Sequence, residues 1–190
     1  EGRGWSIDNL TGWAIGYAPK DPTYLLSRGL TVDELISVDL WSYDKPYYAD
    51  YLVFPIKDYK GRIVHLAGRN LDNSESLKKL RWKHTRGKQP ITKYLYNAEC
   101  LGKSNYTYIC EGVSDCISLL ELGLPAVAML GINSPLLGYK KQFAELDYII
   151  AFFDSDRYEL GTPNAGQYKS WSQVTPLLIE LALAIKKPIY

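Results

Sequence analysis

Two short groups of acidic residues have the types and spacing best suited to chemistry. The first runs from Glu111 to Asp115 (EGVSD), and the second from Asp154 to Asp156 (DSD). Each group directly follows an apolar run with the composition of a β-strand. Aspartates two residues apart in an extended segment project to the same side. The spacing therefore predicts that three or four carboxylates converge at one edge of a sheet.

Such a cluster repels itself unless cations neutralise it, and no run of Lys or Arg adjoins either group. Oxygen-only ligands suit Mg²⁺ or Mn²⁺, which typically share their coordination with water and substrate phosphates. A divalent metal is thus the expected partner of the cluster. The alternative interpretation is that Glu111 caps the following helix and that Asp154 and Asp156 are ordinary turn residues.

The second half of the chain alternates between strand and helix patterns, which predicts an open α/β sheet. The expected elements are strands at 106–110, 126–130 and 148–153 and helices at 114–122 and 140–145. The continuously apolar segment 148–153 is typical of a central parallel strand buried on both faces. A long helical stretch follows, with Thr175 and Pro176 as the cap and first position of its second part, and a further strand is expected from Pro188. Ligands of such sheets gather where the strands end, which is where both acidic groups lie.

The first half predicts a smaller, mixed α+β region. Thr31 and Glu34 have the spacing of a capping box at the start of a helix. Segments 51–56 and 61–69 bracket turn residues, as in an antiparallel hairpin. The polar segment 70–92 has no clear periodicity and is read as a loop or a frayed helix.

Charge is distributed unevenly and favours a division into domains at 1–105 and 106–190. The first carries 16 Lys and Arg against 12 Asp and Glu, and the second carries 6 against 9. No acidic residue lies between Ser76 and Ala98, where basic residues alternate with aromatic ones: Lys78, Lys79, Arg81, Trp82, Lys83, Arg86, Lys88, Lys93 and Tyr94. Such a stretch suits a nucleic-acid backbone and its bases. A solvated charged surface is the alternative.

Composition excludes several other classes. The three cysteines form no C-x-x-C pair and lie far in sequence from the only two histidines, His65 and His84, so neither a zinc site nor a disulfide framework is expected. The histidines are read as packing and surface residues. No apolar run approaches the roughly 20 residues of a membrane span. We expect a soluble protein in a reducing compartment.

The acidic motifs resemble the E-G-x-x-D and D-x-D motifs of TOPRIM domains, which primases, topoisomerases and some nucleases share. Four collinear segments of the first half resemble the basic amino-terminal subdomain of DnaG-type bacterial primases. They are 15–19, 24–30, 53–64 with Gly68 and Arg69, and 93–97. The resemblance spans nearly the whole chain. It implies a TOPRIM Rossmann-like parallel sheet, cut short at its C-terminal end, after a smaller basic subdomain.

The same resemblance implies an enzyme, a DNA primase that makes short RNA primers on single-stranded DNA from ribonucleoside triphosphates with Mg²⁺ or Mn²⁺. It implies metal binding by Glu111, Asp154 and Asp156, with Asp115 supporting them. It also implies a groove for nucleotides and template lined by Lys57, Arg62, Arg69, Lys93 and Asn97. A replicative helicase is the implied partner, in the cytoplasm of a bacterium or of a phage-infected cell.

Three departures from the family pattern favour a phage, plasmid or otherwise diverged primase. Ser155 stands where the family usually has Gly, residues 157–164 look like an insertion, and Tyr96 adds a residue before Asn97. Two alternatives remain open. One is a catalytically degenerate, primase-like module that binds single-stranded DNA beside a helicase, and the other is a TOPRIM nuclease.

Overall fold

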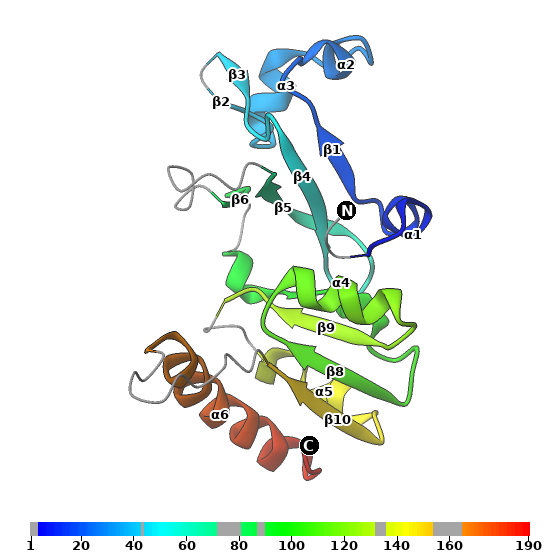
Figure 1. Cartoon of the computed structure of the whole chain (residues 1–190), viewed down its shortest axis with the longest axis vertical. Coiled ribbons are helices and arrows are strands. Elements are labelled where there is room, and N and C mark those ends of the chain that lie inside the picture. Colours follow the sequence, from blue (N-terminus) through cyan, green and yellow to red (C-terminus); the bar gives the residue numbers. More distant parts are fainter. Residues whose placement is uncertain (1–3, 43, 72–80, 87–89, 132–135, 154–164) are drawn as a thin grey trace. The chain divides into compact units, whose positions relative to one another are not determined.

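The computed structural model describes residues 4–42, 44–71, 81–86, 90–131, 136–153 and 165–190 (Figure 1). The chain forms two compact units. Unit 1 contains Glu1–Trp5, Lys57–Arg62 and Thr92–Tyr190, and unit 2 contains Ser6–Ile56 and Ile63–Ile91. The combination of helices and sheets confirms a mixed α/β protein. By packing, residues 92–105 join unit 1, and the functional boundary expected at residue 105 stays a prediction.

Unit 2 is built around a four-stranded sheet in the order β1-β4-β5-β6. Its strands are Gly16–Ala18, Tyr51–Lys57, Ile63–Asn70 and Trp82–His84. β4 and β5 form the predicted hairpin, in which the Asp58 N–H donates to the Arg62 carbonyl (2.9 Å). The described part of the unit also contains a two-stranded sheet and short helices: β2 (Trp41–Ser42), β3 (Lys45–Pro46), α1 (Ile7–Gly12), α2 (Thr23–Leu26) and α3 (Val32–Ser37).

Helix α3 begins with the predicted capping box. The Thr31 hydroxyl accepts the Glu34 N–H (3.2 Å), while the Thr31 N–H donates to the Glu34 carboxylate (2.8 Å). These bonds satisfy backbone donors that the first turn of a helix leaves without an intrahelical partner. Helix α3 buries Leu35, which is 1% exposed.

Strand β6 corrects, at residues 82–84, the expectation of a loop or frayed helix across residues 70–92, of which 72–80 and 87–89 fall outside the described residues. It pairs antiparallel with β5, with Gly68 opposite Lys83 and Arg69 opposite Trp82. Trp82 and His84 therefore share one face of the strand and Lys83 lies on the other. The sequence stretch is too short and too basic to give a strand pattern, and the strand is stabilised by contacts with rings elsewhere in the unit.

Those rings belong to the tyrosine cluster of unit 2, which we define as Tyr47, Tyr48 and Tyr51. Their rings meet edge to face, with centroids 4.9 and 6.2 Å apart. A β-carbon at Gly68 would overlap the ring of Tyr48 and lie 3.0 Å from Tyr51. The close approach of β5 to the cluster therefore requires glycine at this position.

Unit 1 contains a second sheet in the order β10-β8-β9-β7. Strands β8 (Tyr106–Cys110), β9 (Ala126–Met129) and β10 (Tyr148–Phe152) are parallel, and β7 (Leu95–Tyr96) is antiparallel to β9. The predicted alternation of strands and helices is confirmed. The helical elements are η2 (Ile91–Lys93), η3 (Ala98–Cys100), α4 (Val113–Glu121), η4 (Leu136–Tyr139), α5 (Lys140–Ala144) and α6 (Ala165–Ile185), of which Ile91 is assigned to unit 2.

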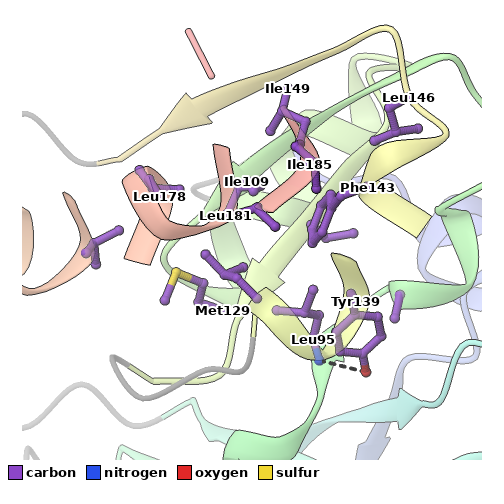
Figure 2. Packing of buried hydrophobic residues seen from close by; sticks show 14 residues of the cluster. Leu95, Ile109, Met129, Tyr139, Phe143, Leu146, Ile149, Leu178, Leu181 and Ile185 are labelled. Carbon is purple, nitrogen blue, oxygen red and sulfur yellow. Dashed lines mark hydrogen bonds between the residues drawn. The ribbon is translucent and has the colours of Figure 1, made fainter. Parts of the chain in front are cut away.

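The core of unit 1 lies between the sheet and the helical elements α5, α6 and η4 (Figure 2). Ile109 and Ile149 contribute from neighbouring strands, and Phe143 and Leu181 from α5 and α6; each is at most 1% exposed. The Leu95 N–H donates to the Tyr139 hydroxyl oxygen (3.4 Å), which joins β7 to η4. Burial of these side chains supplies the hydrophobic free energy that orders the ends of the strands.

Strand β10 is not buried on both faces, contrary to the prediction from its apolar sequence. Within the described chain it pairs with β8 on one side and forms a single bridge to Ile189 on the other. Tyr148 and Phe152 are 37% and 49% exposed. Their rings pack on Tyr106 and Tyr108 across the sheet face. Aromatic pairing on an open face thus explains an apolar run that looked like a fully buried strand.

Helix α6 runs through Pro176 without a break, which corrects the expected second start at Thr175. Val174, Leu178, Leu181 and Ile185 keep a helical spacing and are all buried in the core of unit 1, and this packing holds the helix together across the proline. The bridge at Ile189 confirms the extended segment expected from Pro188. In the part of the chain that is described, no helix combines the length and apolar character needed to traverse a membrane.

Candidate active site and basic surface

The first acidic group lies where the sequence predicts it, at the carboxyl end of a parallel strand. Glu111 directly follows β8, is exposed, and precedes the start of α4 at Val113. The register pairs Cys110 with Phe152, so β8 and β10 end at the same edge. Asp154 and Asp156 fall outside the described residues. Their proximity to Glu111 therefore stays a prediction.

Asp115 has a definite structural role at this edge. Its carboxylate accepts the Gly112 N–H (3.1 Å), and the Gly112 carbonyl accepts the Asp115 N–H (3.2 Å). A β-carbon at Gly112 would lie 2.9 Å from the same carboxylate oxygen. Asp115 thus closes the first turn of α4, and the alternative interpretation of Glu111 as the capping residue stays a prediction. Among the residues that are described, no three His, Cys, Asp or Glu side chains gather into a metal-binding group.

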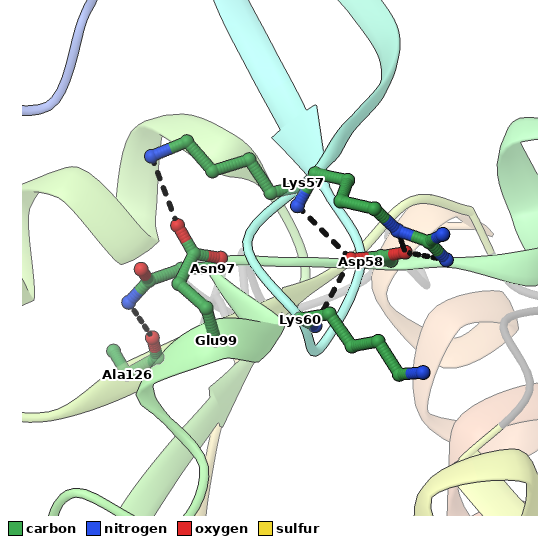
Figure 3. A network of polar contacts seen from close by, with 7 residues as sticks. Lys57, Asp58, Lys60, Asn97, Glu99 and Ala126 are labelled. Carbon is green, nitrogen blue, oxygen red and sulfur yellow. Dashed lines mark hydrogen bonds and ion pairs between the residues drawn. The ribbon is translucent and has the colours of Figure 1, made fainter.

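Lys57 lies at the end of β4 and is held by a carboxylate (Figure 3). Its ammonium nitrogen is 3.2 Å from Oε1 of Glu99. The two side chains are 28% and 19% exposed, so the pair is shielded from water on most sides. Glu99 was missed as a site residue, although it is the only acidic residue between Glu75 and Glu111 in the sequence.

Arg62 lies in the turn after β4 and is paired differently. Its guanidinium binds Oδ2 of Asp58 through Nε (2.8 Å) and Nη2 (2.7 Å), while the Arg62 side chain stays 72% exposed. Burial alone would raise the pKa of Asp58. Hydrogen bonds from the side chain and backbone of Arg62 and from the Lys60 N–H outweigh it and lower that pKa. The guanidinium keeps exposed donors in addition to those bound to Asp58.

Asn97 faces the sheet of unit 1. Its backbone is left-handed (φ 60°, ψ 29°), a conformation that Asn tolerates better than most residues. Its side-chain amide donates to the Ala126 carbonyl (2.8 Å) at the start of β9. The predicted direct contact of Asn97 with nucleotide or template stays untested, and the amide is engaged in holding the chain just before Glu99.

The remaining predicted basic residues differ in their surroundings. Lys93 is exposed at the end of η2 in unit 1. Arg69 belongs to unit 2, and its guanidinium lies 5.4 Å from the ring centre of Trp82. The Trp82 ring in turn lies 5.6 Å from the ring of Phe54.

The basic stretch of the sequence is only partly described, because Lys78, Lys79 and Lys88 fall outside the described residues. Lys83 lies against the tyrosine cluster, with its ammonium nitrogen 4.5 Å from the ring centre of Tyr51 and 5.2 Å from that of Tyr47. It also donates to the Tyr47 carbonyl (3.2 Å). Lys83 therefore stabilises β6, which the charge pattern alone did not indicate.

The histidines and cysteines behave as the sequence predicts. His65 is buried beside the Thr85 carbonyl (3.1 Å), and His84 is exposed on β6. Cys110 and Cys116 are buried, Cys100 is half-buried, and all three are free thiols. Burial raises the pKa of Cys100 to about 12, with a further contribution from Glu99.

The fold is shared with the catalytic cores of primases. The Escherichia coli primase catalytic core aligns with a TM-score of 0.67 over 93% of this chain and 58% of that chain, at 24% identity. The zinc-binding and RNA polymerase domains of Aquifex aeolicus primase align with a TM-score of 0.73 over 100% of this chain and 47% of that chain, at 17% identity.

Sequence comparison gives the family itself. The model of the DNA primase catalytic core, N-terminal domain, matches residues 1–99. The DNA primase of Clostridium acetobutylicum is 34% identical over 68% of this chain and 23% of its own length. That of Escherichia coli K12 is 28% identical over 90% and 30%. The chain thus belongs to the DnaG-type primase family, and it spans about a quarter to a third of the length of these relatives.

Proposed function

We propose that this chain is the catalytic core of a DNA primase that synthesises short RNA primers on single-stranded DNA. The observation that carries the proposal is the order of its parts. A family-specific amino-terminal domain over residues 1–99 is followed by a parallel α/β unit that presents Glu111 at the end of β8. The functional division would fall near residue 105, and residues 106–190 would be the TOPRIM domain.

A divalent metal fits the donors of this edge. Glu111 is an exposed oxygen donor at the carboxyl end of a strand, and Asp115 holds the adjoining turn. Glu111, Asp154 and Asp156 would hold Mg²⁺ or Mn²⁺, with Asp115 supporting Glu111. When bound, the metal would lower the barrier by making the 3′-hydroxyl easier to deprotonate and by stabilising negative charge on the leaving pyrophosphate. The reaction is attack of a ribose 3′-hydroxyl on the α-phosphate of a ribonucleoside triphosphate, with loss of pyrophosphate.

The basic residues would bind the phosphates on which this reaction acts. Lys57, Arg62 and Lys93 come from unit 1, and Arg69 from unit 2. Charge-assisted bonds from Lys and Arg to phosphate neutralise the backbone and orient the triphosphate. Asn97 would contribute to the same binding by holding in place the turn that carries Glu99.

The partners follow from the same proposal. A DnaG catalytic domain of 23% identity was solved bound to single-stranded DNA and aligns with a TM-score of 0.70 over 99% of this chain and 62% of that chain. A single-stranded DNA template is accordingly the proposed partner of this chain, together with ribonucleoside triphosphates and a replicative helicase. The place of action would be the cytoplasm of a bacterium or of a phage-infected cell.

The test is primer synthesis from labelled ribonucleotides on single-stranded DNA with Mg²⁺ or Mn²⁺. The wild-type chain is compared with Asp154→Ala and with a longer version that includes flanking sequence. Asp147→Ala serves as the matched control, because Asp147 immediately precedes β10 at the end remote from Asp154. We expect product from the wild type and the control and a loss of about 100-fold or more for Asp154→Ala.

Two results would favour the other functions. DNA binding without synthesis or cleavage, even by the longer version, would indicate a non-catalytic module. Metal-dependent cleavage of DNA without synthesis would indicate a nuclease.

A further inference from the structure

The pair formed by Lys57 and Glu99 brings together two segments that are far apart in the sequence. Lys57 is the last residue of β4. Glu99 lies in η3, the short helix that begins just after the left-handed Asn97. Both belong to unit 1. Figure 3 shows the two side chains approaching one another, with the Asn97 amide directed to Ala126 beside them.

Glu99 is the rigid member of this pair. The turn that carries it is fixed by the bond from Asn97 to the Ala126 carbonyl (2.8 Å) and by the Cys100 N–H, which donates to the Asn97 carbonyl (3.0 Å). The neighbouring Ala98 is fully buried. Lys57, by contrast, carries its charge at the end of a flexible stem of four methylenes. The geometry of the pair is therefore set by Glu99.

Breaking this ion pair would also be energetically costly. Glu99 Oε2 is buried and has no hydrogen-bond partner in the described part of the protein, so Lys57 is the cation that stabilises this carboxylate. Removal of one member of a shielded pair leaves a poorly solvated charge, which is costly. An ammonium group has three N–H donors. Lys57 can thus keep its bond to Glu99 and offer its other donors to a phosphate.

We propose that Glu99 is the positioning residue for Lys57 and holds its ammonium group in place for the phosphates of the single-stranded DNA template. The inference rests on the proposed function, in which Lys57 binds phosphate. It assigns Asn97 an indirect role, because Asn97 anchors the turn that carries Glu99. Without Glu99, the lysine stem regains rotamer freedom that must be lost again on each binding event.

The experiment measures the affinity of the 190-residue chain for a fluorescein-labelled single-stranded oligonucleotide by anisotropy. The variants are Glu99→Gln, Lys57→Gln and the double substitution. Glu99→Gln keeps the shape of the side chain and removes its charge. We expect it to weaken binding about threefold to tenfold. Lys57→Gln should weaken binding at least as much, and the double variant should bind no more weakly than Lys57→Gln alone.

Glu145→Gln is the matched control, because it makes the same change in net charge at an exposed position at the end of α5. We expect it to bind as the wild type does or slightly more tightly. General electrostatics predicts tighter DNA binding whenever a carboxylate is removed. A loss with Glu99→Gln therefore has the opposite sign to the non-specific effect. Thermal unfolding of each variant checks that the fold is retained.

Three results would overturn the positioning role. Unchanged or tighter binding by Glu99→Gln would mean that Glu99 is neutral or competes with phosphate for Lys57. Additive losses in the double variant would mean that Glu99 acts independently of Lys57. Wild-type affinity in Lys57→Gln would instead remove Lys57 from the proposed phosphate-binding surface, and the positioning role would fall with it. Primer synthesis that persists in Lys57→Gln would then leave the proposed enzyme intact.

Discussion

Two basic side chains of unit 1 and two of unit 2 differ in their kind of partner. In unit 1, Lys57 and Arg62 are bound to carboxylates, Glu99 and Asp58. In unit 2, Lys83 and Arg69 lie against aromatic rings. A carboxylate positions a cation through directed hydrogen bonds and leaves its remaining donors to a phosphate. An aromatic face attracts the cation more diffusely, and the contact is part of the packing.

The comparison shows why charge along a sequence is a weak guide to a binding surface. The seven basic residues between Ser76 and Ala98 look like one continuous nucleic-acid contact. Lys83, in the middle of that stretch, stabilises β6 against the tyrosine cluster. Lys57 lies outside it and has the more directed geometry. The following predictions test this division of roles.

The largest effect is expected from Gly68→Ala, which would disrupt the tyrosine cluster against which Lys83 packs. The new β-carbon would overlap the ring of Tyr48, which is 3% exposed and cannot move into solvent without loss of packing. We expect the free energy of unfolding to fall by about 2–3 kcal/mol, measured by urea denaturation. Gly16→Ala in β1 is the control, since no atom lies within 4 Å of its new β-carbon. Equal stability of the two variants would contradict the packing argument.

Lys83→Gln should reduce stability by about 1–2 kcal/mol, because it removes two cation–ring contacts and the bond to the Tyr47 carbonyl. Chemical denaturation is again the measurement, with the exposed Lys45→Gln as control. The salt dependence of DNA binding should stay as in the wild type. A salt slope reduced by about 0.7 would instead indicate that Lys83 contacts a phosphate.

Asp58→Asn tests the carboxylate side of the comparison through pH. The pKa of Asp58 is lowered in the folded protein, so its ionised form stabilises the fold above the ordinary carboxyl pKa of roughly 4. This contribution is lost as the pH falls through the lowered pKa. We expect the variant to be less stable by about 1 kcal/mol near neutral pH and equal to the wild type in strong acid. A difference that is independent of pH would rule out the charged form as its source.

The smallest effect is expected from Lys93→Gln, which removes an exposed cation from unit 1. If Lys93 contacts one phosphate, the slope of log affinity against log salt for single-stranded DNA should fall by about 0.7. The loss of affinity at moderate salt should be about twofold. Lys141→Gln, on the exposed side of α5, should leave both quantities unchanged.

Local signals in the sequence were sufficient for much of the fold. The capping box at Thr31, the hairpin of β4 and β5 and the alternation of β8, α4 and β9 are all confirmed. Each depends on residues close together in the chain. The failures concern tertiary packing. The pairing of β6, the exposed face of β10 and the continuity of α6 across Pro176 depend on partners distant in sequence.

The same contrast between local sequence signals and tertiary contacts applies to the candidate site. Glu111 was placed correctly at the end of a strand, because strand order and an apolar run determine it locally. The capping role of Asp115 was not predicted, since the side chain that closes a first turn depends on its rotamer. Glu99 was missed because an ion pair between distant segments leaves no periodic pattern in the sequence.

The three buried or half-buried thiols have a practical consequence. The pKa of Cys100 is about 12 and that of Cys116 is also raised, both mainly by burial, so few thiolates form at neutral pH. Maleimide dyes react with thiolates that they can reach. A single cysteine introduced at an exposed position, such as Lys141→Cys in unit 1 or Lys45→Cys in unit 2, would be labelled selectively with the native cysteines in place. Energy transfer between two such labels, one in each unit, would then measure the distance between them with and without DNA.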